Sequence, residues 1–138
     1  MDKKKILFIE DEEAISMALT SELERNGFTA KQAFDGKSGL EIAISMKPDL
    51  ILLDLILPGT SGFDVLKELK ESPITSGIPV IIISALEQDE DIKRGLKMGA
   101  LDYFAKSNNT LAEIVEKINN FLKYGKTNSG ANSQKPAE

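Results

Sequence analysis

Short apolar runs alternate with longer segments of helical periodicity along most of this chain, and that alternation limits the possible folds more than any other feature. The runs expected to form strands lie at residues 5–9, 29–34, 50–53, 79–83 and 101–105. The segments that follow them carry apolar residues three or four positions apart, as amphipathic helices do. Strands and helices that alternate at this spacing form parallel β-α-β units with right-handed crossovers. The sequence therefore predicts an α/β sandwich.

The chain has the length and apolar content of one domain. It has 138 residues, of which 41% are hydrophobic, enough for a single buried core. We expect the domain to span residues 3–124 and the polar residues 125–138 to form a flexible tail or a linker stub. The net charge of −5 argues against direct contact with nucleic acid. No apolar stretch is long enough for a bilayer and no signal-peptide core is present, so a cytoplasmic location without membrane contact is expected.

Cysteine and histidine are both missing, and each of these absences removes a class of chemistry. Without cysteine, there is no disulfide, thiolate zinc site or cysteine nucleophile. Without histidine, the chain has no serine triad with a histidine base, no imidazole metal site and no phosphohistidine of its own. Chemistry in this protein must therefore use carboxylates, hydroxyls and lysines.

Three carboxylates directly follow predicted strands: Glu10 and Asp11 after the first, and Asp54 after the third. Ligands of open α/β sheets bind at the carboxyl ends of the strands, where these side chains should converge. Without a counter-ion they would repel one another, and some would take up protons. A hard cation relieves that conflict, and a few oxygen ligands with room for water favour Mg²⁺ over Ca²⁺. The alternative is that Asp11 caps the following helix, as acidic residues often do.

Ser84 ends the fourth predicted strand and Lys106 follows the fifth, so both should reach the same edge of the sheet. The small Ala85 should leave its backbone N–H accessible to an anion. Taken alone, a serine after a strand is uninformative and a lone lysine is usually a solvated charge. Together with the carboxylates, they indicate a site for a divalent cation and a phosphoryl group.

On these residues the chain resembles the receiver domain of two-component response regulators, in the chemotaxis-regulator-like superfamily, over about residues 3–124. Four stretches carry the resemblance in the usual order and spacing: Ile-Leu-Phe-Ile-Glu10-Asp11-Glu12, Leu-Leu-Asp54-Leu-Ile-Leu-Pro58-Gly-Thr-Ser-Gly62, Ile-Ile-Ser84-Ala85 and Asp102-Tyr103-Phe-Ala-Lys106. The resemblance implies a flavodoxin-like three-layer sandwich, with five helices around a five-stranded parallel sheet of order 2-1-3-4-5.

The resemblance implies that Asp54 is the phosphoacceptor, taking a phosphoryl group from a phosphohistidine in a Mg²⁺-dependent reaction. It implies that Asp11, Asp54 and the backbone carbonyl of Ile56 bind Mg²⁺, and that Glu10 acts through a metal-bound water. The chemistry of a carboxylate nucleophile that forms an acyl phosphate agrees with these roles.

The phosphoryl oxygens are implied to contact the Ser84 hydroxyl, the Ala85 N–H and the Lys106 ammonium. Tyr103 corresponds to an aromatic residue whose exposure changes on activation in the family. The resemblance implies that Ser84 moves together with it, and that these two residues form a conformational switch. The expected helix over residues 88–98 carries an interior glycine, which costs roughly 1 kcal/mol relative to alanine. We therefore expect this helix to be the element that moves.

The implied function is a phosphorylation-dependent signalling switch in a two-component phosphorelay. Such a protein is not an enzyme with outside substrates, because it catalyses only its own phosphorylation and dephosphorylation. The implied partners are a sensor histidine kinase or phosphotransfer protein, and a downstream protein or a missing effector domain. A homodimer formed on activation is a further option. The surface around the fourth helix, fifth strand and fifth helix is expected to change and so control a partner.

Three other functions fit parts of the pattern. A hydrolase of the haloacid-dehalogenase type also forms an aspartyl phosphate after an apolar strand, but it needs a second Asp where this chain has Ile56. A flavodoxin-type FMN or nucleotide binder needs a Gly/Ser/Thr-rich loop after the first strand, where residues 10–13 are all acidic. A receiver-like domain that has lost phosphorylation is the main rival, since Lys106 precedes Ser107 and not the proline usual in the family. That departure predicts a trans bond and a helix cap from Asn109 or Thr110.

Overall fold

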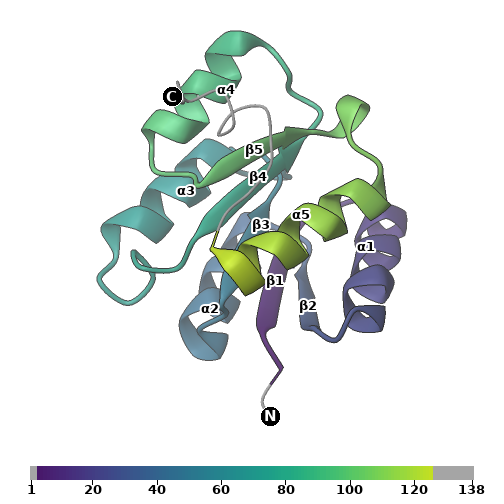
Figure 1. Ribbon diagram of the computed structural model, residues 1–138. Helices are drawn as coiled ribbons and strands as arrows, with labels where there is room; N and C mark the ends of the chain where they lie inside the picture. The colour runs from purple at the N-terminus through teal and green to yellow at the C-terminus, as the bar shows by residue number, and fades with distance from the viewer. Residues whose placement is uncertain (1–2, 126–138) are drawn as a thin grey trace.

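One parallel sheet forms the centre of the molecule, seen in a computed structural model that describes residues 3–125 (Figure 1). Its strands are β1 (Lys5–Ile9), β2 (Thr29–Ala33), β3 (Leu50–Leu53), β4 (Val80–Ser84) and β5 (Asp102–Ala105). The strand order is β2-β1-β3-β4-β5, and every neighbouring pair is parallel. Both the parallel sheet and the order 2-1-3-4-5 are thus confirmed.

Helices cover both faces of the sheet. They are α1 (Glu13–Arg25), α2 (Gly36–Met46), α3 (Gly62–Glu71), α4 (Asp89–Lys97) and α5 (Leu111–Tyr124). The α1 and α5 helices pack on one face, through residues such as Leu19 and Ile118, and α2, α3 and α4 pack on the other. The predicted three-layer sandwich with five helices is confirmed.

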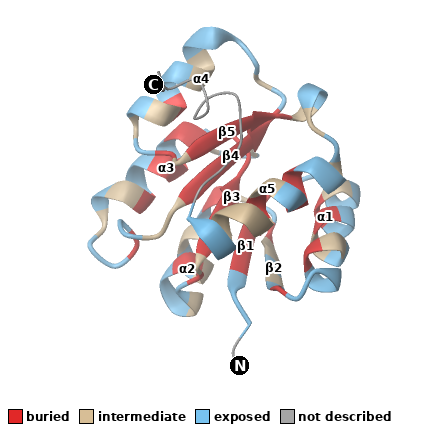
Figure 2. Ribbon diagram, viewed as in Figure 1, coloured by how far each residue is buried: buried red, intermediate tan, exposed pale blue. Residues whose placement is uncertain are grey.

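Each strand contributes to both hydrophobic cores because side chains alternate across a sheet. In β1, Leu7 and Ile9 face α2, α3 and α4, whereas Ile6 and Phe8 face α1 and α5. All four side chains are fully buried, which explains why the strand is a continuous apolar run (Figure 2). The polar residues that follow such runs are therefore held at the end of a rigid layer.

The connection between β5 and α5 follows the path expected from Ser107. No cis peptide bond occurs among the described residues, and Lys106–Asn108 forms a short 3-10 turn. Thr110 caps α5: its hydroxyl accepts from the Glu113 N–H, and the Glu113 carboxylate accepts from the Thr110 N–H. Of the two capping residues predicted, Thr110 takes the role.

Two further predictions concern the polar tail and the absence of a membrane-spanning segment. The polar tail predicted for residues 125–138 lies outside the described residues, except for Gly125, which ends α5 in a left-handed conformation. No helix within residues 3–125 combines the length and the apolar character needed to cross a bilayer.

Gly62 allows α3 to approach the end of β3 very closely. Gly62 is the first residue of α3, and its N–H donates to the Leu55 carbonyl over 2.9 Å. A Cβ atom at Gly62 would lie 2.3 Å from the Asp54 carbonyl oxygen and 2.4 Å from the Leu55 Cα. Since both obstacles are backbone atoms, a side chain here requires α3 or the strand end to move.

Gly62→Ala is therefore expected to lower the free energy of unfolding by about 3 kcal/mol, through overpacking at the strand end. Chemical denaturation measures this change. The matched control is Gly77→Ala, because a Cβ atom there meets no heavy atom within 4 Å. The control should change stability by less than about 0.5 kcal/mol, and equal losses in both variants would contradict the close approach at Gly62.

Candidate functional site

The polar residues singled out in the sequence meet at the carboxyl edge of the sheet. Glu10 directly follows β1, Asp54 follows β3, Ser84 ends β4, and Lys106 begins the turn after β5. These four strands are consecutive neighbours in the sheet. Adjacent parallel strands therefore deliver all four side chains to one place, as expected for the carboxyl ends of an open α/β sheet.

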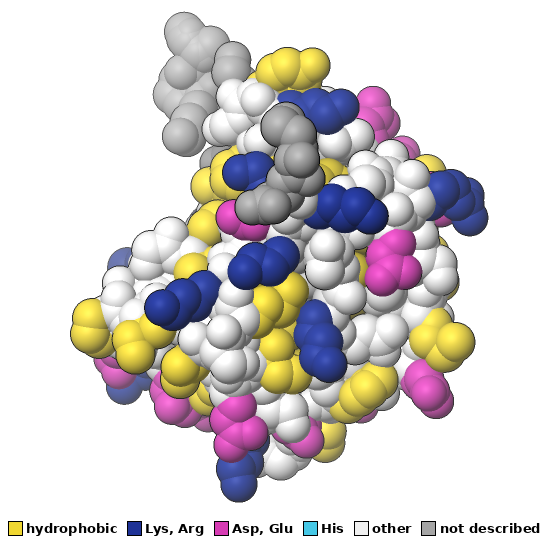
Figure 3. Space-filling view, turned by 90° about the horizontal axis from the view of Figure 1, so that it is seen from below, with side chains coloured by type: hydrophobic (Ala, Val, Ile, Leu, Met, Phe, Trp, Pro, Cys, Tyr) yellow, Lys and Arg dark blue, Asp and Glu magenta, His cyan; other side chains and the backbone are white. Residues whose placement is uncertain are grey.

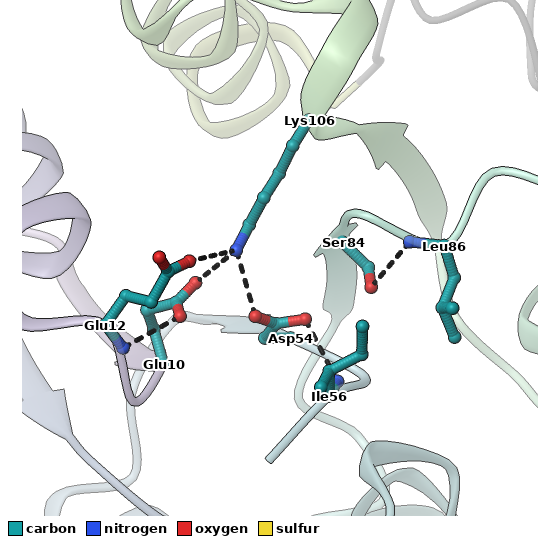
Figure 4. Close-up of polar contacts among 7 residues, drawn as sticks. All are labelled: Glu10, Glu12, Asp54, Ile56, Ser84, Leu86 and Lys106. Carbon is teal, nitrogen blue, oxygen red and sulfur yellow. Dashed lines mark hydrogen bonds and ion pairs between the residues drawn. The ribbon is translucent and has the colours of Figure 1, made fainter.

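Lys106 lies at the centre of this group and contacts three carboxylates (Figure 4). Its Nζ is 2.8 Å from Glu10 Oε1, 3.0 Å from Asp54 Oδ2 and 3.4 Å from Glu12 Oε1. Glu10 is fully buried and Asp54 nearly so, which makes the first two contacts the significant ones. The exposed Glu12 pair contributes less because solvent screens it.

Backbone N–H groups hold the two buried carboxylates in place. Glu10 Oε2 accepts from the Glu12 N–H over 3.0 Å, and Asp54 Oδ1 accepts from the Ile56 N–H over 3.1 Å. Each carboxylate thus directs one oxygen to a loop amide and the other to Lys106. These two contacts fix the orientation of Asp54.

Glu10, Asp11 and Asp54 lie close enough together to hold a metal ion. One carboxylate oxygen from each lies within 4.8 Å of the other two. Asp11 is exposed, so this cluster opens to solvent on one side and leaves space for water ligands. The oxygen-only donors and the opening fit Mg²⁺. Asp11 does not cap α1, because Glu12 occupies the N-cap position and makes no side-chain capping bond.

The electrostatics reflect three carboxylates that share one ammonium group. Burial raises the pKa of Glu10 from its usual value of 4.5 to about 7, although the bonds from Lys106 and the Glu12 N–H oppose that rise. Burial alone would lower the pKa of Lys106, but its hydrogen bonds with Glu10 and Asp54 outweigh burial and raise it. The site therefore holds a charged lysine and an excess of negative charge that a cation would relieve.

The raised pKa of Glu10 predicts a pH dependence of stability in protein free of divalent cations. The folded state holds the Glu10 proton more tightly than the unfolded state, so this stabilising contribution is complete below 4.5 and is lost as the pH rises through about 7. We expect a loss on the order of 2 kcal/mol across that window. Denaturation at a series of pH values in a chelator measures it. Glu10→Gln should remove the dependence and the exposed Glu116→Gln should keep it; parallel curves for Glu10→Gln and wild type would contradict the assignment.

Ser84 and Tyr103 lie together on the β4 and β5 side of Asp54. Ser84 is fully buried, and its Oγ accepts from the Leu86 N–H over 3.3 Å. Tyr103 is buried as well, and its hydroxyl donates to the Leu86 carbonyl over 2.5 Å. Burial raises the pKa of Tyr103 to about 12, so the phenol keeps its proton. The loop after β4 therefore links both residues predicted to form a switch.

Two contacts near the site were not predicted from the sequence. Glu12 joins Lys106, which the acidic run at residues 10–13 could have suggested. The Ser107 hydroxyl donates to Glu87 Oε1 over 2.5 Å and so connects the loop after β5 to the loop after β4. No sequence signal indicates that pair, because both residues lie in exposed loops. Ala85 is also exposed, at the start of the second of these loops.

The sequence matches the family model for the response regulator receiver domain over residues 6–119. It is 42% identical over 102 residues to the DNA-binding dual master transcriptional regulator RpaA of Synechocystis sp. PCC 6803; the match covers 74% of this chain and 42% of RpaA. It is 36% identical over 102 residues to protein PilH of Pseudomonas aeruginosa, covering 74% of this chain and 84% of PilH. The match thus spans less than half of RpaA but most of PilH.

Solved structures show the same fold. The receiver domain of the Francisella response regulator 1452 has a TM-score of 0.81 and 33% identity, with 90% of this chain and all of that chain covered. The phosphorylated cyanobacterial phytochrome response regulator RcpA has a TM-score of 0.78 and 31% identity, covering 91% and 98%. The Mn²⁺-bound form of response regulator Rcp1 has a TM-score of 0.74 and 28% identity, covering 90% and 97%.

Proposed function

The chain belongs to the response regulator receiver domain family, and we propose that it is a phosphorylation-dependent switch in which Asp54 accepts a phosphoryl group. The donor is the phosphohistidine of a sensor histidine kinase or a phosphotransfer protein. The observation that carries this proposal is the arrangement around Asp54: a buried carboxylate, oriented by the Ile56 N–H and 3.0 Å from the Lys106 ammonium. We propose residues 3–124 as the extent of the domain.

In the proposed reaction, an Asp54 carboxylate oxygen forms a bond to phosphorus while the phosphorus–nitrogen bond of the donor breaks. The imidazole leaves with the electron pair and takes up a proton. Because phosphoryl transfer depends mainly on positioning and charge stabilisation, the chain needs fixed groups and not a separate base. The Ser84 hydroxyl, the Ala85 N–H and Lys106 are proposed to bind the phosphoryl oxygens.

Mg²⁺ is the proposed cofactor. Asp11, Asp54 and the Ile56 carbonyl would hold it, with Glu10 acting through a bound water. When bound, the cation supplies positive charge next to the transferred group. Support comes from the carboxylate cluster and from the relative crystallised with Mn²⁺.

The charge count supports a requirement for both cations. After transfer, Glu10 and Asp11 contribute −2 and the phosphoryl group about −2, whereas Mg²⁺ and Lys106 contribute +3. The phosphorylated site is then close to neutral, at about −1. If Mg²⁺ is lost, the excess becomes about −3, so the modified site should form poorly without the metal.

The proposed output starts at Ser84. A phosphoryl group on Asp54 gives the Ser84 hydroxyl a charged acceptor, which changes the loop that also holds the Tyr103 hydroxyl at Leu86. The change would pass to α4, β5 and α5 and so control a downstream protein, an effector domain or a second copy of the chain. The phosphorylation state, and not turnover of an outside substrate, would be the signal.

Incubation with acetyl phosphate and Mg²⁺, followed by intact mass measurement, tests the proposal. The expected result is a gain of one phosphoryl group that requires the metal and disappears when a chelator is present. A chain that gains no mass under these conditions would instead be a receiver-like domain without phosphorylation, the rival considered above.

A further inference from the structure

An open pocket lies at the opposite end of the sheet from Asp54. It has a volume of about 350 Å³ and is formed by the residues before β1, the turn between α1 and β2, and the last turns of α5. Three lysines line it: Lys3, Lys4 and Lys123. Seen from below, this face of the molecule carries several basic side chains around an apolar patch (Figure 3).

The charge at this pocket is opposite in sign to that of the whole protein. The chain has a net charge of −5, yet among residues 3–125 no aspartate or glutamate lines the pocket. Within residues 3–125, none of the three lysines pairs with a carboxylate, whereas Arg25 pairs with Glu22 on the nearby surface of α1. The three lysines therefore carry positive charge that no described carboxylate pairs with, and this charge favours an anionic ligand.

The remaining lining indicates a particular kind of anion. Asn119 provides a carboxamide group and Asn26 provides its amide oxygen, since the Asn26 Nδ2 already donates to the Glu22 carbonyl over 2.8 Å; such groups suit a peptide backbone. Phe28 and Leu122 provide an apolar surface between the lysines. A free phosphate ion would leave that surface uncovered. A nucleic acid would extend beyond the pocket over a protein surface that is acidic on average, which disfavours a long polyanion.

We propose that this pocket binds a short acidic segment of a partner protein, with carboxylates at Lys3, Lys4 and Lys123 and one apolar side chain against Phe28 and Leu122. Because the pocket lies at the opposite end of the sheet from Asp54, the segment can bind without blocking access to the phosphoacceptor. This inference does not depend on the proposed phosphorylation. A pocket that fails to bind leaves the proposed function untouched, and the converse also holds.

Fluorescence anisotropy at low ionic strength tests the pocket, with a fluorescein-labelled Gly-Glu-Glu-Leu-Asp-Asp peptide amide as the probe. We expect saturable binding that weakens as salt increases, because the contacts are exposed ion pairs. A peptide with glycine in place of leucine and a peptide with Gln and Asn in place of its acids should both bind more weakly. Equal binding of all three peptides would overturn the proposal.

The variant that locates the site combines Lys4→Gln with Lys123→Gln, and it should raise the Kd of the probe about tenfold, as expected from the loss of two exposed ion pairs. The control combines Lys93→Gln with Lys97→Gln on α4, which removes the same charge at an exposed and distant place. Circular dichroism verifies that both variants are folded. An equal loss in the control, no loss in the pocket variant, or an oligonucleotide that competes as well as unlabelled peptide would each overturn the proposal.

Discussion

Asp54→Asn is expected to abolish the gain of a phosphoryl group from acetyl phosphate in the presence of Mg²⁺. The substitution removes the nucleophile and the negative charge that pairs with Lys106 over 3.0 Å, while the amide keeps nearly the size and shape of the carboxylate. The asparagine Oδ1 keeps the acceptor for the Ile56 N–H, so the local backbone should be preserved. Intact mass before and after incubation measures the outcome directly.

The control for this variant is Asp64→Asn, which removes a carboxylate in the first turn of α3, an exposed position. It should gain one phosphoryl group as the wild type does. A mass gain that persists in Asp54→Asn would mean that another carboxylate or a hydroxyl is the acceptor, and the proposed chemistry would be wrong. A gain lost in both variants would point to general damage and would not support Asp54.

Most of the fold and the composition of the site could be predicted because both depend on the ends of apolar strands. The run at residues 50–53 is buried on both faces, and Asp54 is the first residue that cannot continue it. The same reasoning places Glu10 after β1 and Ser84 at the end of β4. In a parallel sheet these ends share one edge, so their meeting follows from topology alone.

The contacts within the site could not be predicted, because they depend on loop paths and side-chain reach. Lys106 can extend in several directions from its turn, and only the folded arrangement shows that it meets Glu10 and Asp54. The bond between Ser107 and Glu87 joins two exposed loops that no periodic pattern places side by side. The alternative in which Asp11 caps the following helix does not hold, because the N-cap position falls one residue later, at Glu12.

Gly62 and Gly95 show the same limit for the packing of helices on the sheet. From the sequence, Gly95 is only a local cost to the stability of the expected helix. In the structure, a Cβ at Gly95 would lie 2.6 Å from the Ile82 Cδ1 and 3.4 Å from the Tyr103 Cδ2, so this glycine allows α4 to pack closely over β4 and β5. How closely a helix approaches the sheet depends on the residues of both elements, so the sequence of one element alone does not predict it.

Lys106→Met is expected to slow the phosphorylation of Asp54 by acetyl phosphate about 100-fold, the usual cost of losing one fixed donor to developing charge. Methionine keeps most of the length and apolar stem of the side chain, so the main loss is the ammonium group. Without it, the phosphorylated site changes from about −1 to about −2, and Glu10 and Asp54 lose their shared partner.

The time course of the mass gain measures this rate, with Mg²⁺ saturating so that metal affinity does not limit it. Lys97→Met, at an exposed position on α4, is the matched control and should react at the wild-type rate. An unchanged rate in Lys106→Met would mean that the metal and backbone amides stabilise the transferred group without the lysine. Lys106 would then act chiefly as a counter-ion that keeps Glu10 and Asp54 together in the unmodified protein, and denaturation of the variant without metal would show the loss of stability that this role requires.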